Sequence, residues 1–219
     1  MDRQILRAVQ RHYAQAPLRD RIHVAARLAL CPFRRLATFV PSAGLIVDLG
    51  CGHGHLAHAL AMDGPRRRVV GVDPSARKLV LANSVPNGSR RVHFVQGDAL
   101  SNPVAGPCRA ILLVDILYLL NRAQQEQVLR NCHDRLAPGG TLLVKTMDDR
   151  PAWKAGLSRL EEWLAVHVLR ITLCQGSAFA FRSLSEWAAL CERIGFETLV
   201  VRLDRGYYHP HGAIVGVRR

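Results

Sequence analysis

The sequence has few lysines, no closely spaced cysteine pair and no long apolar run. These absences argue against a disulfide-bonded protein and against a membrane-spanning one. Its six cysteines include no C-x-x-C pair, which favours free thiols in a reducing cytoplasm over a disulfide framework. No apolar run reaches the roughly 18–20 residues that a membrane-spanning helix needs. The first 15 residues are charged and amphipathic, without the apolar centre of a signal peptide. We therefore expect a cytoplasmic globular protein.

Basic residues outnumber acidic ones by 30 to 17, which gives a net charge of +13, and only three of the basic residues are lysines. Such a surface attracts acidic partners: a nucleic acid, an anionic membrane, an acidic carrier protein or a phosphorylated substrate. An arginine-rich and alanine-rich composition is also what drift in a GC-rich coding sequence produces. Charge alone leaves both explanations open.

Short apolar runs alternate with helical patterns along the 219 residues. The apolar runs are continuous, which is typical of a parallel sheet covered on both faces. Strands are predicted at 45–50, 67–73, 91–98, 109–115, 141–147, 196–205 and 212–219, and helices at 2–15, 22–30, 33–40, 53–63, 74–84, 122–137 and 183–195. The pattern predicts one α/β domain with a doubly wound, mostly parallel seven-stranded sheet. Helices are added at the N-terminus and after the fifth strand (about 151–174), and one antiparallel strand lies at or near an edge.

A glycine-rich stretch, VDLGCGHGHLAHAL, follows the first predicted strand. Gly50, Gly52 and Gly54 alternate after Asp48, at the sheet edge where ligands of such folds bind. Glycines let backbone N–H groups approach a ligand closely. The sixth position counted from Gly50 is His55 rather than glycine, so the stretch lacks the G-x-G-x-x-G spacing of a dinucleotide site.

The same stretch suggests metal ligands, because Cys51, His53, His55 and His58 are closely spaced. A structural zinc site needs four side chains aimed inward with supporting contacts, and a glycine turn aims side chains poorly. We therefore predict no metal site and expect His55 and His58 to lie on the helix surface or to pack.

Five motifs in register resemble those of class I S-adenosylmethionine-dependent methyltransferases. VDLGCGHGHLA resembles the cofactor loop, and VVGVDPS, VQGDAL, LLVDILYLL and LAPGGTLLVK resemble the motifs that follow the later strands. The resemblance implies a Rossmann-like methyltransferase fold that binds S-adenosyl-L-methionine. It assigns cofactor contacts to Asp48, Gly50, Cys51, Gly52, Gly54, Asp73, Pro74, Asp98, Ala99 and Asp115.

The resemblance also implies particular roles for the acids. Asp73 would hold the ribose hydroxyls, Asp98 the adenine amino group, and Asp115 would face the methionine end or the substrate. Asp48 would act through the loop backbone or on the methionine ammonium group. The residues alone leave open that Asp73 caps the helix before Pro74 and that Asp98 is a turn acid.

Within a single domain, the resemblance implies three parts. Residues 1–43 would form a helical lid, 44–147 the cofactor-binding core, and 148–219 the substrate-side helices and a C-terminal hairpin. The apolar insertion within 151–174 would roof a pocket, dimerise or rest on a membrane surface. The layout of the C-terminal part loosely resembles small bacterial methyltransferases of lipid, polyketide or pigment biosynthesis.

The acceptor is predicted to be a small molecule, a lipid-like molecule or a carrier-bound one, and methylation is expected on oxygen. Amine-directed nucleic-acid methyltransferases carry an N/D/S-P-P-Y/F tetrad where this chain has D-I-L-Y, so an RNA substrate rests on charge alone. A non-catalytic cofactor-binding scaffold is a further alternative. Candidate catalytic residues are His209 and His211, either of which is a possible general base, and Tyr118. The alternative for the histidines is that they cap an edge hairpin, and for Tyr118 that it packs against the lid.

Overall fold

The computed structural model of the chain describes residues 1–85, 91–101, 103–148 and 180–219. Its centre is a seven-stranded sheet with the order β3-β2-β1-β4-β5-β7-β6. β1 to β5 pair in parallel, whereas β7 runs antiparallel to both β5 and β6. The strands are β1 (Ala43–Leu49), β2 (Arg66–Asp73), β3 (Val92–Gln96), β4 (Cys108–Val114), β5 (Leu136–Met147), β6 (Phe196–Arg202) and β7 (His211–Arg218).

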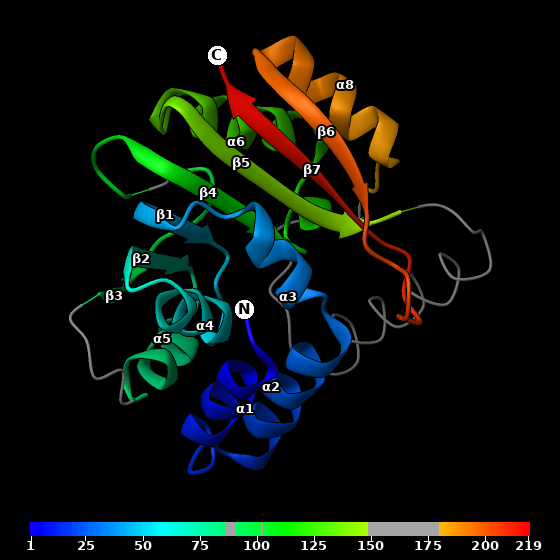
Figure 1. Cartoon of the computed structure of the whole chain (residues 1–219). Helices are drawn as coiled ribbons and strands as arrows, with labels where there is room; N and C mark the ends of the chain where they lie inside the picture. Colours follow the sequence, from blue (N-terminus) through cyan, green and yellow to red (C-terminus); the bar gives the residue numbers. More distant parts are fainter. Residues whose placement is uncertain (86–90, 102, 149–179) are drawn as a thin grey trace.

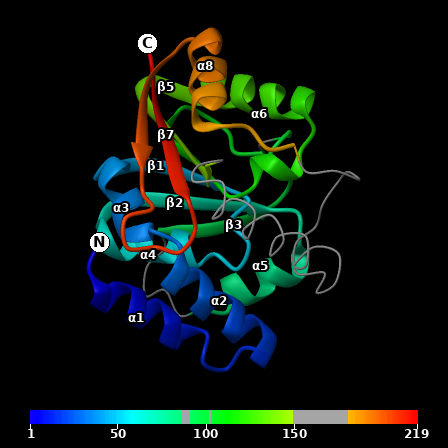
Figure 2. The same cartoon turned by 90° about the vertical axis from the view of Figure 1, so that its right-hand side faces the viewer.

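Helices cover both faces of this sheet (Figure 1, Figure 2). On one face lie α1 (Arg3–His12), α2 (Leu18–Leu30), α3 (Phe33–Leu36), α4 (His55–Asp63) and α5 (Ala76–Asn83). The other face carries α6 (Arg122–Arg135) and α8 (Leu184–Ile194). Two short 3₁₀ turns, η1 (Ala37–Phe39) and η2 (Leu117–Leu119), complete the described elements.

Successive side chains of the central strands enter two different cores. Ile46 of β1 and Leu112 of β4 pack with α1 to α4, whereas Val47 and Leu113 of the same strands pack with α6 and α8. All four side chains are fully buried. Both faces of β1 and β4 are therefore covered, which explains why their sequences are apolar without alternation.

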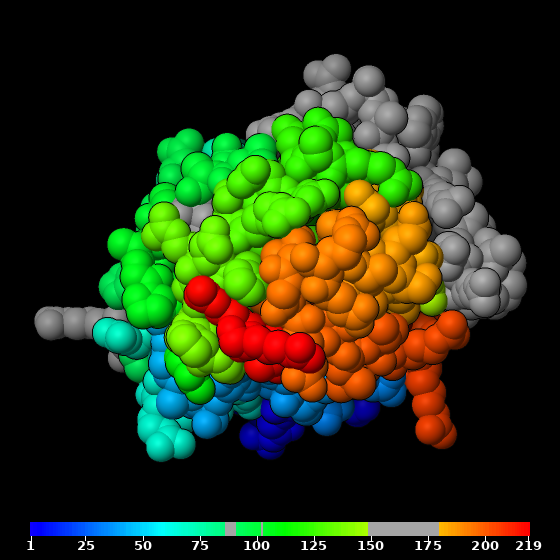
Figure 3. Space-filling view, turned by 90° about the horizontal axis from the view of Figure 1, so that it is seen from above, coloured from blue at the N-terminus to red at the C-terminus, as the bar shows by residue number. Residues whose placement is uncertain are grey.

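The second layer is formed by α6 and α8, which lie side by side when the molecule is viewed from above (Figure 3). Each begins with a capping box, made by Asn121 with Gln124 in α6 and by Ser183 with Glu186 in α8. α8 ends at Gly195, whose positive φ of 116° terminates the helix. Ser183 and Gly195, the first and last residues of the helix predicted at 183–195, are thus its N-cap and C-cap residues.

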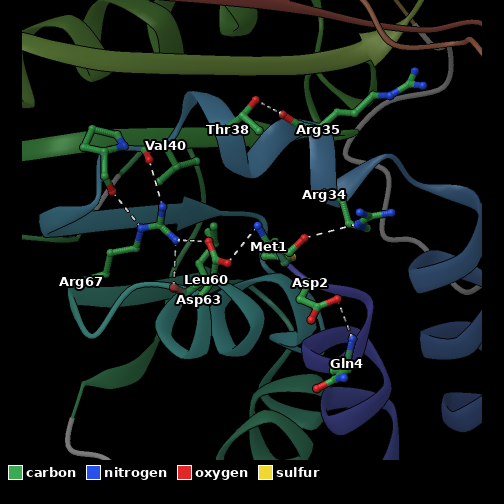
Figure 4. Close-up of polar contacts among 11 residues, drawn as sticks. Met1, Asp2, Gln4, Arg34, Arg35, Thr38, Val40, Leu60, Asp63 and Arg67 are labelled. Carbon is green, nitrogen blue, oxygen red and sulfur yellow. Dashed lines mark hydrogen bonds and ion pairs between the residues drawn. The ribbon is translucent and has the colours of Figure 1, made fainter.

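Arg67 ties the N-terminal segment to the sheet (Figure 4). Its guanidinium is almost completely buried and donates hydrogen bonds to the carbonyl oxygens of Val40, Pro41 and Leu60. It also forms an ion pair with Asp63 at the end of α4, 2.9 Å away. Each buried donor thus meets an acceptor, and this arrangement offsets the cost of burying the charge.

The predicted α/β class, the mostly parallel seven-stranded sheet and the antiparallel strand near an edge are confirmed. Some predicted boundaries are wrong: the helix at 122–137 ends at Arg135, and the strand predicted at 141–147 already begins at Leu136. The predicted helical insertion at 151–174 lies outside the described residues. Within the described ranges, no helix is long and apolar enough to cross a membrane.

Candidate functional site

A cavity of about 270 Å³ lies at the carboxyl ends of β1, β2 and β4. Strand order reverses between β1 and β4, and ligands of doubly wound sheets bind at this type of position. Nine of the ten predicted cofactor residues line the cavity, as does Tyr118. The nine are Asp48, Gly50, Cys51, Gly52, Asp73, Pro74, Asp98, Ala99 and Asp115.

The three glycines of the loop all have positive φ, at 75° for Gly50, 54° for Gly52 and 74° for Gly54. A β-carbon on Gly54 would lie 2.5 Å from Cε1 of Phe94, so this glycine is required by packing. A β-carbon on Gly52 would meet no atom within 4 Å, and Gly52 lines the cavity. Gly54 is thus the one predicted cofactor residue that does not line the described wall of the cavity, and its role is to let the loop pack against Phe94. Gly52 lines the cavity itself.

Asp73, at the end of β2, holds the loop through its side chain. Its Oδ2 accepts a hydrogen bond from Gly52 N at 2.9 Å, and its Oδ1 accepts one from Ser75 N at 2.9 Å. The sequence left open that Asp73 caps the helix before Pro74. The N-cap of α5 is instead Ser75, whose side chain accepts from Lys78 N, and Asp73 binds the backbone N–H of this cap residue. The first contact joins the second-strand motif directly to the glycine loop. Asp73 therefore binds both the glycine loop and the residue at the start of α5.

Asp48, at the end of β1, is a buried carboxyl group in the cavity wall. Its Oδ2 has no hydrogen-bond partner among the described residues. Burial, and then the nearby charge of Asp73, raise the pKa of Asp48 to about 7. A buried oxygen of this kind at the edge of a cavity is suited to accept a hydrogen bond from a ligand.

Asp115 follows β4 and is the centre of a buried charge cluster. Its φ is +58°, the left-handed region that non-glycine residues rarely adopt. Lys145 of β5 contacts both carboxylate oxygens, at 2.6 and 2.7 Å, and Arg27 of α2 contacts Oδ2 at 2.8 Å. Burial opposes ionisation of Asp115, but the charges of Lys145 and Arg27 outweigh it and lower its pKa. Asp115 is therefore ionised, and the three-residue cluster carries a net positive charge.

Asp98 and Ala99 follow β3 on the far side of the cavity. Asp98 Oδ1 accepts a hydrogen bond from Ser101 N at 2.7 Å, which is the turn role considered for it. Tyr118 lies in η2, also lines the cavity, is buried, and stacks on Phe181 with ring centroids 5.3 Å apart. Tyr118 is thus held by packing at the border of the cavity.

His209 and His211 are placed away from the described wall of the cavity. His211 begins β7, is buried, and bonds through Nε2 to the carbonyl oxygen of Leu30 at 2.7 Å, which fixes the end of α2. Burial, and then the charge of Lys145, lower the pKa of His211 to about 3. The side chain is therefore neutral at physiological pH and a weak base.

The histidines of the glycine stretch serve packing and loop support. His58 Nε2 bonds to Ala82 O at 3.0 Å, and His55 is buried against Phe33. His53 bonds to Asp20 at 2.9 Å. His53 and His58 bond to different neighbours, and His55, which also lines the cavity, has no hydrogen-bond partner for Nδ1 among the described residues. No group of three metal-binding side chains occurs in the described part of the chain.

Sequence reasoning missed several residues of the cavity wall. His23 and Arg27 of α2 line it, together with Phe33 and Lys78. Asp20, His23 and Arg27 are spaced at i, i+3 and i+7, so they share one face of α2. That spacing was visible in the sequence, but the element against which the face packs was not.

The chain is similar to known methyltransferases. A profile of the methyltransferase domain matches residues 46–140. Acetylserotonin O-methyltransferase of Mus musculus molossinus is 30% identical over 195 residues, covering 86% of this chain and 48% of that protein. The solved pyocyanin biosynthetic protein PhzM superposes with a TM-score of 0.73 at 24% identity, over 94% of this chain and 61% of that one. Human N-acetylserotonin methyltransferase, solved in complex with S-adenosylmethionine (SAM), superposes with a TM-score of 0.66 at 18% identity, over 98% and 55%.

The chain belongs to the class I SAM-dependent methyltransferases, and SAM is the cofactor of this family. It spans about half the length of the curated relatives that it matches. The residues present suit this cofactor, because the cavity offers the open side of Gly52 and the unpartnered Oδ2 of buried Asp48.

Proposed function

We propose that the protein transfers the methyl group of SAM to an oxygen atom of a small, lipid-like or carrier-bound molecule. The observation that carries the proposal is that one cavity gathers the ends of β1, β2 and β4 with nine of the ten motif residues. The similarity to acetylserotonin O-methyltransferase supports oxygen as the accepting atom.

The residues present would hold the cofactor as follows. The carboxylate of Asp73 would accept hydrogen bonds from the ribose hydroxyls, and Asp98 with Ala99 would border the adenine. Gly50 and Gly52 would bring the main chain close to the methionine part, and Asp48 would accept from its ammonium group. Carboxylate acceptors make stronger hydrogen bonds than neutral ones, so Asp73 would contribute strongly to the affinity for the cofactor.

When bound, SAM supplies an electrophilic methyl group on a positively charged sulfur. The protein then has to align the acceptor and keep water out. The cavity wall includes the aromatic side chains of Phe33 and Tyr118 and the apolar side chain of Leu120. We propose that the acceptor lies against this wall.

Deprotonation of the acceptor is the step that the histidines would assist. His23 lines the cavity, but burial lowers its pKa to about 3. His211 is equally weak as a base. Alignment and exclusion of water therefore carry most of the proposed rate enhancement. We expect His209→Ala and His211→Ala to retain turnover at saturating substrate, and a large loss of kcat in either variant would assign it the base.

The five described cysteines are free and buried thiols, which supports a reducing compartment such as the cytoplasm as the place of action. The peripheral membrane contact predicted from the sequence stays a prediction that vesicle co-sedimentation would test.

Methyl transfer from radiolabelled SAM into fractionated cell extract tests the proposal. Label in low-molecular-weight, lipid or carrier-protein fractions is the expected result. Label in RNA would contradict it, and absence of SAM binding by calorimetry would contradict the central claim.

A further inference from the structure

His53 stands between Gly52 and Gly54 in the loop, and its side chain reaches away from the cavity to α2. Its Nε2 lies 2.9 Å from Oδ1 of Asp20. Both side chains are about 2% exposed. Arg77 of α5 completes the group, with Nη2 2.8 Å from Oδ1 and Nη1 2.9 Å from Oδ2 of Asp20. A buried carboxylate thus receives three hydrogen bonds from two other elements of the fold.

The protonation states in this group follow from its contacts. The hydrogen bond from Arg77 outweighs burial and lowers the pKa of Asp20 to about 2, so the carboxylate is ionised and only accepts. Burial lowers the pKa of His53 despite the opposing contact with Asp20, so the ring is neutral. Nε2 must then carry the proton that is donated to Asp20, and Nδ1 is the nitrogen without a partner among the described residues.

A hydrogen bond from the end of α1 also holds the main chain of His53. The hydroxyl of Tyr13, at the end of α1, donates to the carbonyl oxygen of His53. On the opposite side of the loop, Gly52 N donates to Asp73. The loop is therefore fastened on the side of the N-terminal helices through His53 and on the side of the sheet through Asp73.

One face of α2 connects the contact between Asp20 and His53 to the cavity. Asp20 contacts the loop, while His23 and Arg27, one and two turns further along, line the cavity. A displacement of α2 from the loop would move all three side chains together, because they share a rigid helix.

We propose that Asp20, His53 and Arg77 are positioning residues that fix the glycine loop in its cofactor-binding conformation and hold α2 over the bound cofactor. The inference rests on the proposed cofactor role of the loop. It assigns to these residues control over how long the cofactor stays bound, a role separate from contact with the reacting atoms.

The test uses the full chain and S-adenosylhomocysteine, the demethylated form of the cofactor, as the probe. Affinity is measured by calorimetry and dissociation by displacement kinetics. His53→Asn and His53→Gln form a matched pair, because the glutamine amide nitrogen reaches the place of Nε2 and the asparagine one does not. We expect His53→Asn and Asp20→Asn to speed dissociation about tenfold or more, and His53→Gln to stay within about threefold of the wild type. Arg21→Gln, an exposed position next to Asp20, is the control and should match the wild type.

Hydrogen exchange of the backbone amides of residues 50–54 in the cofactor-free protein measures how firmly the loop is held, which turnover does not report. It should be faster in His53→Asn than in His53→Gln. A purely structural role would lower the unfolding temperature of both variants and leave dissociation unchanged well below it.

Equal dissociation rates in wild type and His53→Asn would overturn the inference while the proposed function stands. Failure of the wild type to bind the probe would instead overturn the proposed function. If Asp20→Asn does not fold, the two His53 variants still decide the outcome.

Discussion

Lys145 and Asp115 form a fully buried ion pair in which one ammonium group contacts both oxygens of the carboxylate, at 2.6 and 2.7 Å. Arg27 approaches the same carboxylate from α2, so a strand, a turn and an N-terminal helix meet at one charge. Removal of one partner from a buried pair is costly because the other charge stays without full compensation.

Lys145→Met should therefore lower the free energy of unfolding by about 3 kcal/mol, at the lower end of the range for buried pairs because Arg27 still neutralises Asp115. Urea denaturation measures this change. Arg130→Ala, which removes the exposed pair with Glu126, should leave the free energy of unfolding almost unchanged, because water screens this pair. Similar losses of unfolding free energy in the two variants would mean that the buried pair stabilises the protein no more than a surface pair does.

Alanine at two glycines of the loop should separate folding from binding. Gly54→Ala would place a methyl group 2.9 Å from Cβ of Ala82 and close to Phe94, at positive φ, and should cost about 2–4 kcal/mol of stability. Gly52→Ala meets no atom and should cost about 1 kcal/mol from backbone strain alone. We expect Gly52→Ala to fold and to bind S-adenosylhomocysteine poorly. Wild-type affinity in Gly52→Ala would contradict the approach of the cofactor to this side of the loop.

Asp73→Asn should weaken binding of S-adenosylhomocysteine by about two orders of magnitude, because charge-assisted hydrogen bonds are lost and the amide has a single acceptor oxygen for the contacts to Gly52 and Ser75. Calorimetry measures the change. The exposed Asp134→Asn alters the net charge equally and should leave affinity unchanged. An equal effect of both substitutions would assign the loss to net charge instead of to the site.

The stability of the protein should depend on the ionisation of Asp48. Its pKa is about 7 in the folded state and near 4 in the unfolded chain, so between these values the folded protein binds more protons. The free energy of unfolding should then fall as pH rises through this window, by up to about 1.4 kcal/mol per pH unit. Asp48→Asn should remove this part of the slope. Urea denaturation at pH 5, 6, 7 and 8 makes the comparison, and parallel profiles for the two proteins would refute the prediction.

The sequence predicted the sheet and the position of Asp73 and Asp98 because strands, and the residues that follow them, can be recognised from short stretches of sequence. Parallel strands end at one edge, so an acid that directly follows a strand reaches the same cavity as its neighbours. The contribution of α2 was not predictable in this way. Arg27 meets Asp115 across 88 positions of sequence, and nothing local to Arg27 specifies that partner. His211 illustrates the same limit, since its contact with Leu30 joins the two ends of the chain.

The spacing of Asp20, His23 and Arg27 makes α2 sensitive to length rather than to composition. Insertion or deletion of one residue between Pro17 and Asp20 would turn the helix by about 100° relative to its start and direct all three side chains away from their partners at once. Natural variants of this protein should therefore change the outer residues of α2 freely while keeping its length, and chimeras that exchange this helix should succeed only when the helical phase is preserved.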